Sequence, residues 1–409
     1  ALAALAATGA FAQSTVTIYG RAHVAFDGAY SATGGTNTAG TAAYDIKSRQ
    51  RVSDDGSRIG LRISEDLGGG LRAFSVIETG INIDTATNNA QSGVANSGTG
   101  FFGTREAHVG IGNNMAELRL GRQNVFWGMG PTEDVSANRI SGGVGSSYSA
   151  PSSGYTVAPA ARLENTVQVV AGSDLGGFAG SAVWFAKPVA AETALPLATN
   201  TGNTLGEVKA AAQGFTLRYI TGPFGVQYDY AQVKNAGNGI TTASSFDATN
   251  TGSKLGLSYS YAPGSKVYFA NAVFSTSFTD AAVNNVAPVS IVGTAATGNY
   301  NVGYRKQASN QFGVQHVVGG GLELHAQYVI QGKVKNFAGA DVAATGSKAY
   351  AVGARYELSK RTALTASYNV IDNEAKNNIN LSGGGQSSTP NIGLGATLKV
   401  VRASIQHLF

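Results

Sequence analysis

In Phe224-Gly225-Val226-Gln227-Tyr228-Asp229-Tyr230-Ala231, apolar or aromatic side chains alternate with small or polar ones. Successive side chains of a β-strand point to opposite faces, so this segment has one apolar face and one wet face. The same alternation recurs in residues 322–330, 350–357, 364–370 and 401–409. The pattern predicts an all-β protein.

The composition agrees with many short strands joined by turns. Glycine is abundant, at 55 of 409 residues, and Gly, Asn, Ser and Thr punctuate the chain throughout. Cysteine is absent, and the five histidines are not at metal-ligand spacing, so no metal and no cofactor is expected. The 29 Lys and Arg residues are scattered without a basic tract, so no nucleic-acid partner is expected either.

The connections between the alternating segments switch regularly between short and long. Tight, turn-forming connections are expected at Leu67–Gly70, Asn113–Met115, Asp174–Gly177, Thr221–Pro223, Ala262–Ser265, Val318–Gly321 and Leu358–Arg361. Long polar stretches separate them, at about residues 28–56, 84–101, 125–161, 188–210, 235–252, 277–309, 334–347 and 373–395. Seven short turns and eight long loops predict about sixteen strands, with both termini on the short-turn side.

A soluble β-sandwich would show the same alternation with its apolar face inward. Here the polar positions carry Gly, Ser and Asn as well as charges, as the wall of a water-filled lumen tolerates. Lipid cannot satisfy backbone N–H and C=O groups, so a membrane-spanning sheet must close on itself. A closed sheet of sixteen strands is too wide for its side chains to fill. The sequence therefore predicts a transmembrane antiparallel β-barrel around an aqueous channel, with no catalytic site.

Both ends of the chain carry recognisable segments. The apolar run Ala1 to Ala12 ends in a small-x-small pattern and is interpreted as the remaining part of a signal peptide. Residues 13–409 are then expected to form a single barrel domain. At the other end, Val401 to Phe409 alternates strictly and finishes on phenylalanine.

Several segments together resemble the Gram-negative general porins, especially the β-proteobacterial branch. They are Ser14 to Gly20, Ser57 to Leu61, Arg105 to Gly110, Leu120 to Gln123 and Ile405 to Phe409. The resemblance implies a homotrimer in the outer-membrane lipid, with short periplasmic turns, long extracellular loops and periplasmic termini. It also implies that the outer-membrane insertion machinery reads Phe409 as an assembly signal.

In that family the third loop folds into the lumen and carries acidic residues that face a ladder of wall arginines. The third loop here would be residues 125–161, with Glu133 and Asp134 as the acidic candidates. The Gly130-Pro131-Thr132-Glu133-Asp134 stretch is all that remains of the enteric Pro-Glu-Phe-Gly-Gly signature. By motif position, the wall residues would be Arg21, Arg58, Arg122 and, more loosely, Arg162.

Alternation provides an independent assignment of lumen-facing residues. It places the following side chains in the lumen: Tyr19, Arg21, His23, Arg58, Arg62, Glu117 and Arg119. It places Arg122 on the lipid side, whereas the Gly-Arg-Gln motif places it in the lumen. The motif is preferred, because a lipid-facing arginine at mid-depth costs about 2–4 kcal/mol.

These observations predict passive diffusion of small hydrophilic solutes and ions, with a preference for anions created by Arg21, Arg58, Arg62, Arg122 and Arg162. Solvated lumen charges with little selectivity are the simpler alternative. A substrate-selective channel, a secreted adhesin or β-solenoid, and a barrel enzyme are the others. A solenoid should show a fixed short repeat, and the chain has none. Neither a Ser-His-Asp set nor a pair of catalytic carboxylates can be argued from the spacing.

Overall fold

The computed structural model describes residues 14–37, 40–84, 87–88, 103, 105–124, 162–172, 180–187, 209–236, 248–278, 304–336, 339–381 and 392–409. The regular structure of these residues is entirely β. Within these ranges, no helix has the length and apolar character needed to cross a membrane.

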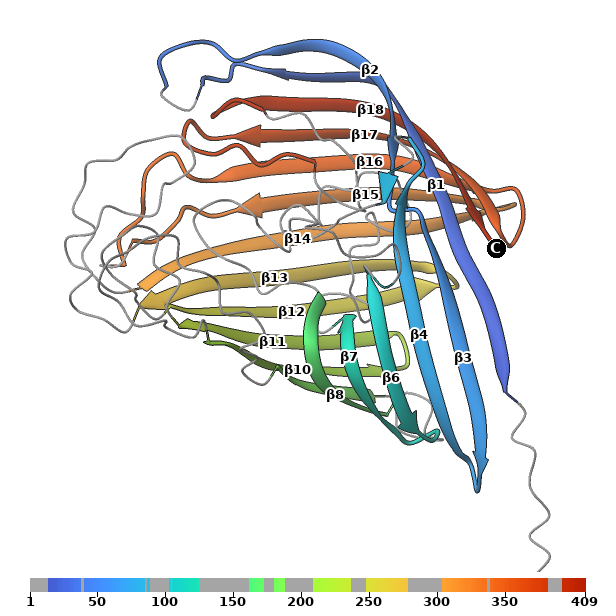
Figure 1. Ribbon diagram of the computed structural model, residues 1–409. Helices are drawn as coiled ribbons and strands as arrows, with labels where there is room; N and C mark the ends of the chain where they lie inside the picture. The colour runs from blue at the N-terminus through green and yellow to red at the C-terminus, as the bar shows by residue number, and fades with distance from the viewer. Residues whose placement is uncertain are drawn as a thin grey trace, which may run out of the picture.

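The strands follow one another around a curved wall (Figure 1). They are β1 (Thr15–Thr33), β2 (Ile46–Asp54), β3 (Arg58–Gly68), β4 (Leu71–Asn82), β5 (Thr87–Asn88), β6 (Glu106–Gly112), β7 (Ala116–Asn124), β8 (Arg162–Gly172), β9 (Gly180–Lys187), β10 (Lys209–Thr221), β11 (Phe224–Ala236), β12 (Ala248–Ala262), β13 (Ser265–Phe278), β14 (Tyr304–Gly319), β15 (Leu322–Gln331), β16 (Ser347–Glu357), β17 (Thr362–Asn373) and β18 (Thr397–Leu408).

The sheet closes because its first strand pairs with its last. β1 and β18 are antiparallel from Arg21 opposite Leu408 to Thr33 opposite Thr397. Beyond that pairing, the backbone N–H of Gly20 donates to the carbonyl of Phe409 at 2.9 Å. Figure 1 shows the C-terminus lying beside β1.

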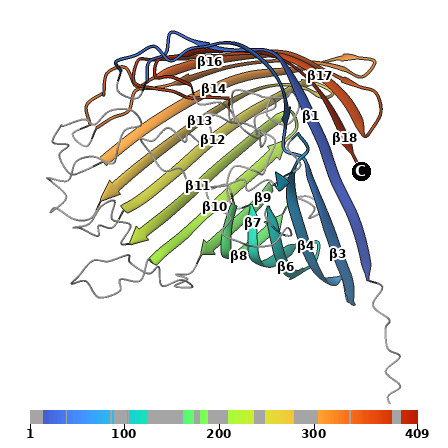
Figure 2. The same cartoon turned by 45° about the horizontal axis from the view of Figure 1, so that its top comes forward.

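The wall has sixteen positions, although eighteen strands carry labels. β2 and β3 occupy one position between them, because β1 pairs with β2 over its second half and with β3 over its first half. β5 has two residues and pairs only with the end of β4. The predicted antiparallel barrel of about sixteen strands is therefore confirmed, and Figure 2 shows β10 to β16 forming the wall that faces β1, β3 and β4.

The two faces of the sheet are reversed relative to a soluble protein. In β11, Phe224 is 58% exposed, whereas the neighbouring inward positions Gln227 and Asp229 are 0% and 1% exposed. β15, β17 and β18 repeat the pattern with exposed Leu324, Leu364 and Ile405. Apolar side chains outside and polar ones inside are what a lipid-embedded cylinder with a wet interior requires.

Six of the seven predicted short connections join consecutive strands at one end of the wall. The seventh, at Asp174–Gly177, lies outside the described residues, as do the signal segment 1–12 and the third loop 125–161.

The long stretch expected at 28–56 is shorter than predicted. β1 continues to Thr33, and β2 fills residues 46–54 within that stretch. Most side chains of β2 are polar on both faces, so the strand lacks the apolar alternation that reveals a lipid-facing segment. Backbone pairing with β1 holds it in place instead.

Candidate ion-conducting site on the inner wall

A row of inward positions crosses β1, β3, β4 and β6. Tyr19 lies opposite Gly60, Gly60 opposite Glu78, and Glu78 opposite Glu106. A Cβ atom at Gly60 would lie 2.5 Å from the ring of Tyr19, so the ring lies across the space that glycine leaves. This position lets the Tyr19 hydroxyl donate to Glu78 Oε2 at 3.1 Å.

Glu78 lies within this row and forms ion pairs with two arginines. Arg105 Nε lies 2.6 Å from Oε1 of Glu78, and Arg58 Nε lies 3.4 Å from Oε2. The guanidinium of Arg62 lies over the Tyr19 ring, 4.1 Å from its centroid. A cation over an aromatic face is attracted by the ring quadrupole, which holds Arg62 beside this group.

Glu106 extends the group toward β8. Asn124 donates from Nδ2 to Glu106 Oε1 at 2.9 Å, and Asn124 lies opposite Arg162 in the β7–β8 register. The Arg162 guanidinium is attracted by Glu106 and Glu78 and repelled by Arg105 and Arg58. A break in this register between Gly121 and Gln123 accompanies the left-handed backbone of Asn165, at φ 54°, where β8 changes course.

These side chains form one charged group, which we call the basic wall cluster. Its five arginines surround two glutamates, Glu78 and Glu106. The arginines are Arg21, Arg58, Arg62, Arg105 and Arg162. Arginines therefore outnumber glutamates by three in this cluster, and the Asp54 and Asp55 carboxylates of the adjoining backbone also attract Arg21.

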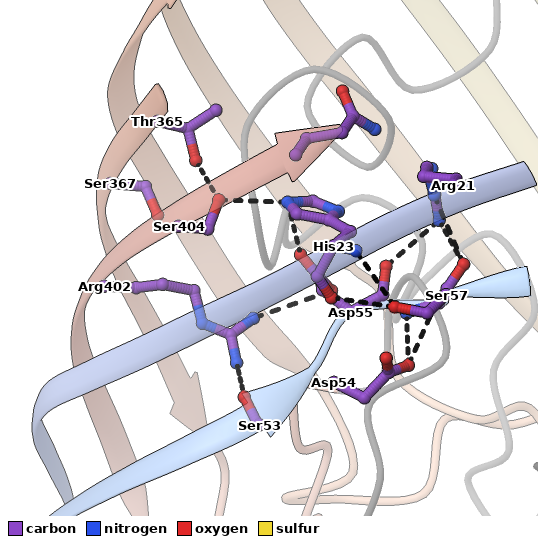
Figure 3. Close-up of polar contacts among 12 residues, drawn as sticks. Arg21, His23, Ser53, Asp54, Asp55, Ser57, Thr365, Ser367, Arg402 and Ser404 are labelled. Atoms are coloured by element: carbon purple, nitrogen blue, oxygen red, sulfur yellow. Dashed lines mark hydrogen bonds and ion pairs between the residues drawn. The ribbon is translucent and has the colours of Figure 1, made fainter. Parts of the chain in front are cut away.

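Arg21 is held by the backbone that separates β2 from β3 (Figure 3). Its Nη2 donates to the carbonyl oxygens of Asp55 at 3.0 Å and Gly56 at 2.9 Å. These carbonyls are available because Gly56 adopts a left-handed φ of 82° and interrupts the ladder. The carboxylate of Asp54 accepts the N–H groups of Gly56 and Ser57 at 2.8 and 3.0 Å and fixes the kink.

A second buried group, the seam network, joins the first strands to the last. Arg402 of β18 is fully buried and donates from Nε to Asp27 Oδ1 of β1 at 2.5 Å, and from Nη2 to Ser53 Oγ at 2.9 Å. Arg51 of β2 binds the other carboxylate oxygen of Asp27 at 2.6 Å. Asp55 lies 3.8 Å from Arg402 Nη1. The network therefore links β1, β2 and β18 by charge as well as by backbone pairing.

His23 lies on the inner face, as alternation predicts, but it is buried against the wall (Figure 3). Its Nε2 is 3.0 Å from Ser404 Oγ and 3.5 Å from Asp55 Oδ2. A Ser-His-Asp triad places the serine and the carboxylate on opposite ring nitrogens. Because both partners share one nitrogen, these three residues do not form such a triad.

Glu117 and Arg119 lie on β7 toward the short-turn end of the wall, and Arg119 attracts Glu106 of the basic wall cluster. Glu117 Oε2 accepts from Arg119 Nε at 2.9 Å, and its other carboxylate oxygen pairs with Arg72. Phe74 shares this inner face, with the Arg72 and Arg119 guanidinium groups 5.5 and 5.9 Å from its ring centroid. This group contains one acidic residue and two basic residues.

Arg122 lies apart from the basic wall cluster, contrary to the motif-based expectation. It shares its parity with the exposed Leu118 and Leu120, lies opposite Ala107, and pairs through Nη1 with Glu164 at 3.0 Å. The pairing with Glu164 supplies the partner that an outward-facing arginine needs. This position agrees with the parity of the strand, and the lumen-facing role assigned from the Gly-Arg-Gln motif stays a prediction.

Three cluster members were missed in the sequence: Arg105, Glu78 and Glu106. Glu78 and Glu106 lie on the inward parity of their strands, so alternation could have identified them. Arg105 precedes β6 and shares its parity with the outward Val109, so alternation could not have identified it. Glu133 and Asp134 lie outside the described residues. Among the residues with described positions, no group of three His, Asp or Glu side chains is arranged to hold a metal ion.

A sequence model of the Gram-negative porins matches residues 1–376. The chain belongs to the Gram-negative porin family. Outer membrane porin protein 32 of Delftia acidovorans is 37% identical over 131 residues, which are 31% of this porin and 31% of the relative. Major outer membrane protein P.IA of Neisseria meningitidis serogroup C is 36% identical over 74 residues, 18% of this chain and 16% of the relative. The porin thus matches less than a third of the length of these curated relatives.

Solved structures share its fold over nearly the whole chain. The anion-selective porin from Comamonas acidovorans has a TM-score of 0.67 at 21% identity, covering 97% of this porin and 100% of that chain. OmpT of Vibrio cholerae, in a trimer form, has a TM-score of 0.60 at 13% identity, covering 97% and 99%. The porin is therefore a multi-pass outer-membrane β-barrel, of a family and fold that form channels.

Proposed function

We propose that this porin is a passive, anion-preferring pore for small hydrophilic solutes and ions. The observation that carries the proposal is the composition of the basic wall cluster, in which five inward arginines surround two glutamates. A one-sided charge lining a low-dielectric channel raises the local concentration of counter-ions and filters charge. Anions therefore cross this cylinder more readily than cations.

The acidic residues Glu133 and Asp134 of the third loop belong to the same proposal. Placed in the lumen opposite the basic wall cluster, they would create a transverse field that orients dipolar solutes. The simpler alternative is a set of solvated lumen charges without selectivity. The cluster argues against it, because Arg21 and Arg105 are held against the wall by a hydrogen bond and an ion pair, and the charges of the cluster are concentrated in one place.

The decisive measurement is the reversal potential of single channels in a KCl gradient. The wild-type protein should give the sign of an anion-preferring pore. Arg58→Gln and Arg62→Gln should each reduce the anion preference, because both side chains are at least partly exposed to the lumen. Glu78→Gln should increase it, because one of the two negative charges is removed.

The matched control is Arg361→Gln, which removes the same charge from the exposed short turn between β16 and β17. It should leave the reversal potential unchanged. Cation preference in the wild-type protein, or equal shifts for Arg58→Gln and Arg361→Gln, would sink the assignment of selectivity to the basic wall cluster.

The same proposal includes a homotrimer embedded in outer-membrane lipid, supported by the trimer form of the V. cholerae protein of the same fold. It also includes Phe409 as the signal for the insertion machinery. The aromatic ring of Phe409 lies outward and is 46% exposed, while its backbone pairs with Gly20. An aromatic side chain exposed at the end of the closing strand is accessible to an assembly factor.

A further inference from the structure

The inner wall changes character at its extracellular end over β15 to β18 and β1. Gln327 of β15, Ser367 of β17 and Ser404 of β18 are polar inward residues, but further along the same parities the side chains become apolar. These apolar inward side chains are Tyr30, Ala32, Val329, Ala349, Ala351, Ile371, Leu398 and Val400, and all are buried. An apolar patch facing a water-filled lumen would be unfavourable, so another segment must cover it.

The cover is the connection between β17 and β18. Ile379, Leu381 and Ile392 belong to the same buried apolar cluster as the wall side chains, and Ala396 joins them. We call the described parts of this connection, residues 374–381 and 392–396, the extracellular shelf. They lie at the end of the wall opposite the short turns, on its inner side.

Buried asparagines fasten the shelf to the wall. Asn377 donates from Nδ2 to Gln331 Oε1 at 3.0 Å and to the carbonyl of Thr345 at 3.0 Å. Asn373 donates to the carbonyls of Ile379 and Ala396, each at 3.0 Å. Amides buried with several partners hold a segment in one position, because releasing them would leave polar groups unsatisfied.

The shelf is also paired with the first hairpin. The backbones of Thr36 and Leu394 exchange two hydrogen bonds, each 2.9 Å long. The Tyr30 hydroxyl donates to Asn380 Oδ1 at 3.0 Å. The shelf is therefore attached to β15, to the connection after it and to β1 at once, and behaves as part of the wall.

From this arrangement we infer that the extracellular shelf is a second, fixed determinant of pore conductance, separate from the basic wall cluster. It fills one side of the extracellular half of the lumen and confines ions and solutes to the side of β10 to β14. Its described residues carry one acid, Glu374, and one base, Lys376, so they add no net charge. The shelf therefore restricts the cross-section of the path without changing the sign of selectivity. The inference rests on the proposed channel function.

The test first removes contacts that attach the shelf to the wall and then restores the attachment with a disulfide. Asn377→Ala removes the amide that binds Gln331 and Thr345, and Leu381→Ser weakens the apolar packing without touching that amide. Both variants, refolded as full chains, should give larger single-channel conductance steps than the wild type, with an unchanged sign of reversal potential. Asn336→Ala is the control, because Asn336 caps an exposed turn outside the shelf.

The disulfide uses the absence of cysteine from the chain. Residues that exchange two hydrogen bonds across antiparallel strands have Cα atoms about 5.5 Å apart, which suits a disulfide. Thr36→Cys with Leu394→Cys, added to Asn377→Ala, should return conductance to the wild-type value when oxidised and raise it again on reduction.

Wild-type conductance in both release variants would overturn the inference, and so would a rise that oxidation fails to reverse. A wild-type protein that forms no channel at all would instead refute the proposed function. Folding of each variant is checked by its heat-dependent mobility on a gel. The two release variants remove different contacts. If one of them fails to fold, the other still tests the inference.

Discussion

Arg402 and Asp27 form a buried ion pair in which each residue also binds a further partner. Both side chains are fully buried, and each binds further partners, Ser53 for the arginine and Arg51 for the aspartate. A buried ion pair with complete hydrogen bonding adds little net stability over an apolar pair, but removing one partner leaves an uncompensated charge. Removing one partner of this pair should therefore lower the free energy of unfolding more than the intact pair raises it.

We predict that Arg402→Met lowers the free energy of unfolding by about 3–5 kcal/mol, because Asp27 is left buried with a reduced set of partners. The double variant Asp27→Asn with Arg402→Met should recover a large part of that loss. Urea unfolding of the refolded barrel measures both. A double variant as unstable as the single one would show that the seam depends on the ion pair itself.

Among the strands, β1 connects the largest number of structural features of the barrel. It pairs with three other strands, supplies residues to the basic wall cluster and the seam network, and packs against the extracellular shelf. It also contains a close approach at Gly20. A Cβ atom there would lie 2.2 Å from the Phe409 ring and 2.7 Å from the carbonyl oxygen of Arg58.

Gly20→Ala should therefore destabilise the closed barrel by about 1–3 kcal/mol, because the added methyl group meets backbone as well as a ring. Gly28→Ala in the same strand is the matched control, since a Cβ at Gly28 has its nearest neighbour at 3.5 Å, an ordinary contact. The fraction of protein that refolds to the heat-modifiable form compares the two. Equal refolding would mean that Phe409 and its neighbours adjust freely at the seam.

Strands with an apolar outer face could be predicted from the sequence, and β2, whose side chains are mostly polar, could not. Phe224 to Ala231 alternates because one face touches lipid, whereas Ile46–Asp54 is polar at most positions and lacks that signal. The inward side of Arg21, Arg58 and Arg62 followed from the same alternation. The kink at Gly56 that holds Arg21, and the shelf over Ala349, depend on tertiary contacts that no local pattern reveals.

At the scale of the whole molecule, selectivity is a property of the summed field in the lumen. Mobile ions screen that field over about 10 Å at 0.1 M salt and about 3 Å at 1 M. The anion preference should therefore decrease as the mean KCl concentration rises at a fixed gradient ratio. Reversal potentials at several mean concentrations measure it, and a preference independent of salt would point to selection by size or by direct binding instead.

The bond between Arg402 and Asp27 spans 375 residues of sequence, and it lies where the cylinder closes. Until the last strand is in place, β1 keeps an open edge with unpaired N–H and C=O groups, which invites pairing with other chains. Such distant contacts form late and slowly. The cylinder consequently cannot close before Thr397–Leu408 is present, and every shorter length of the chain leaves the edge of β1 without its final partner.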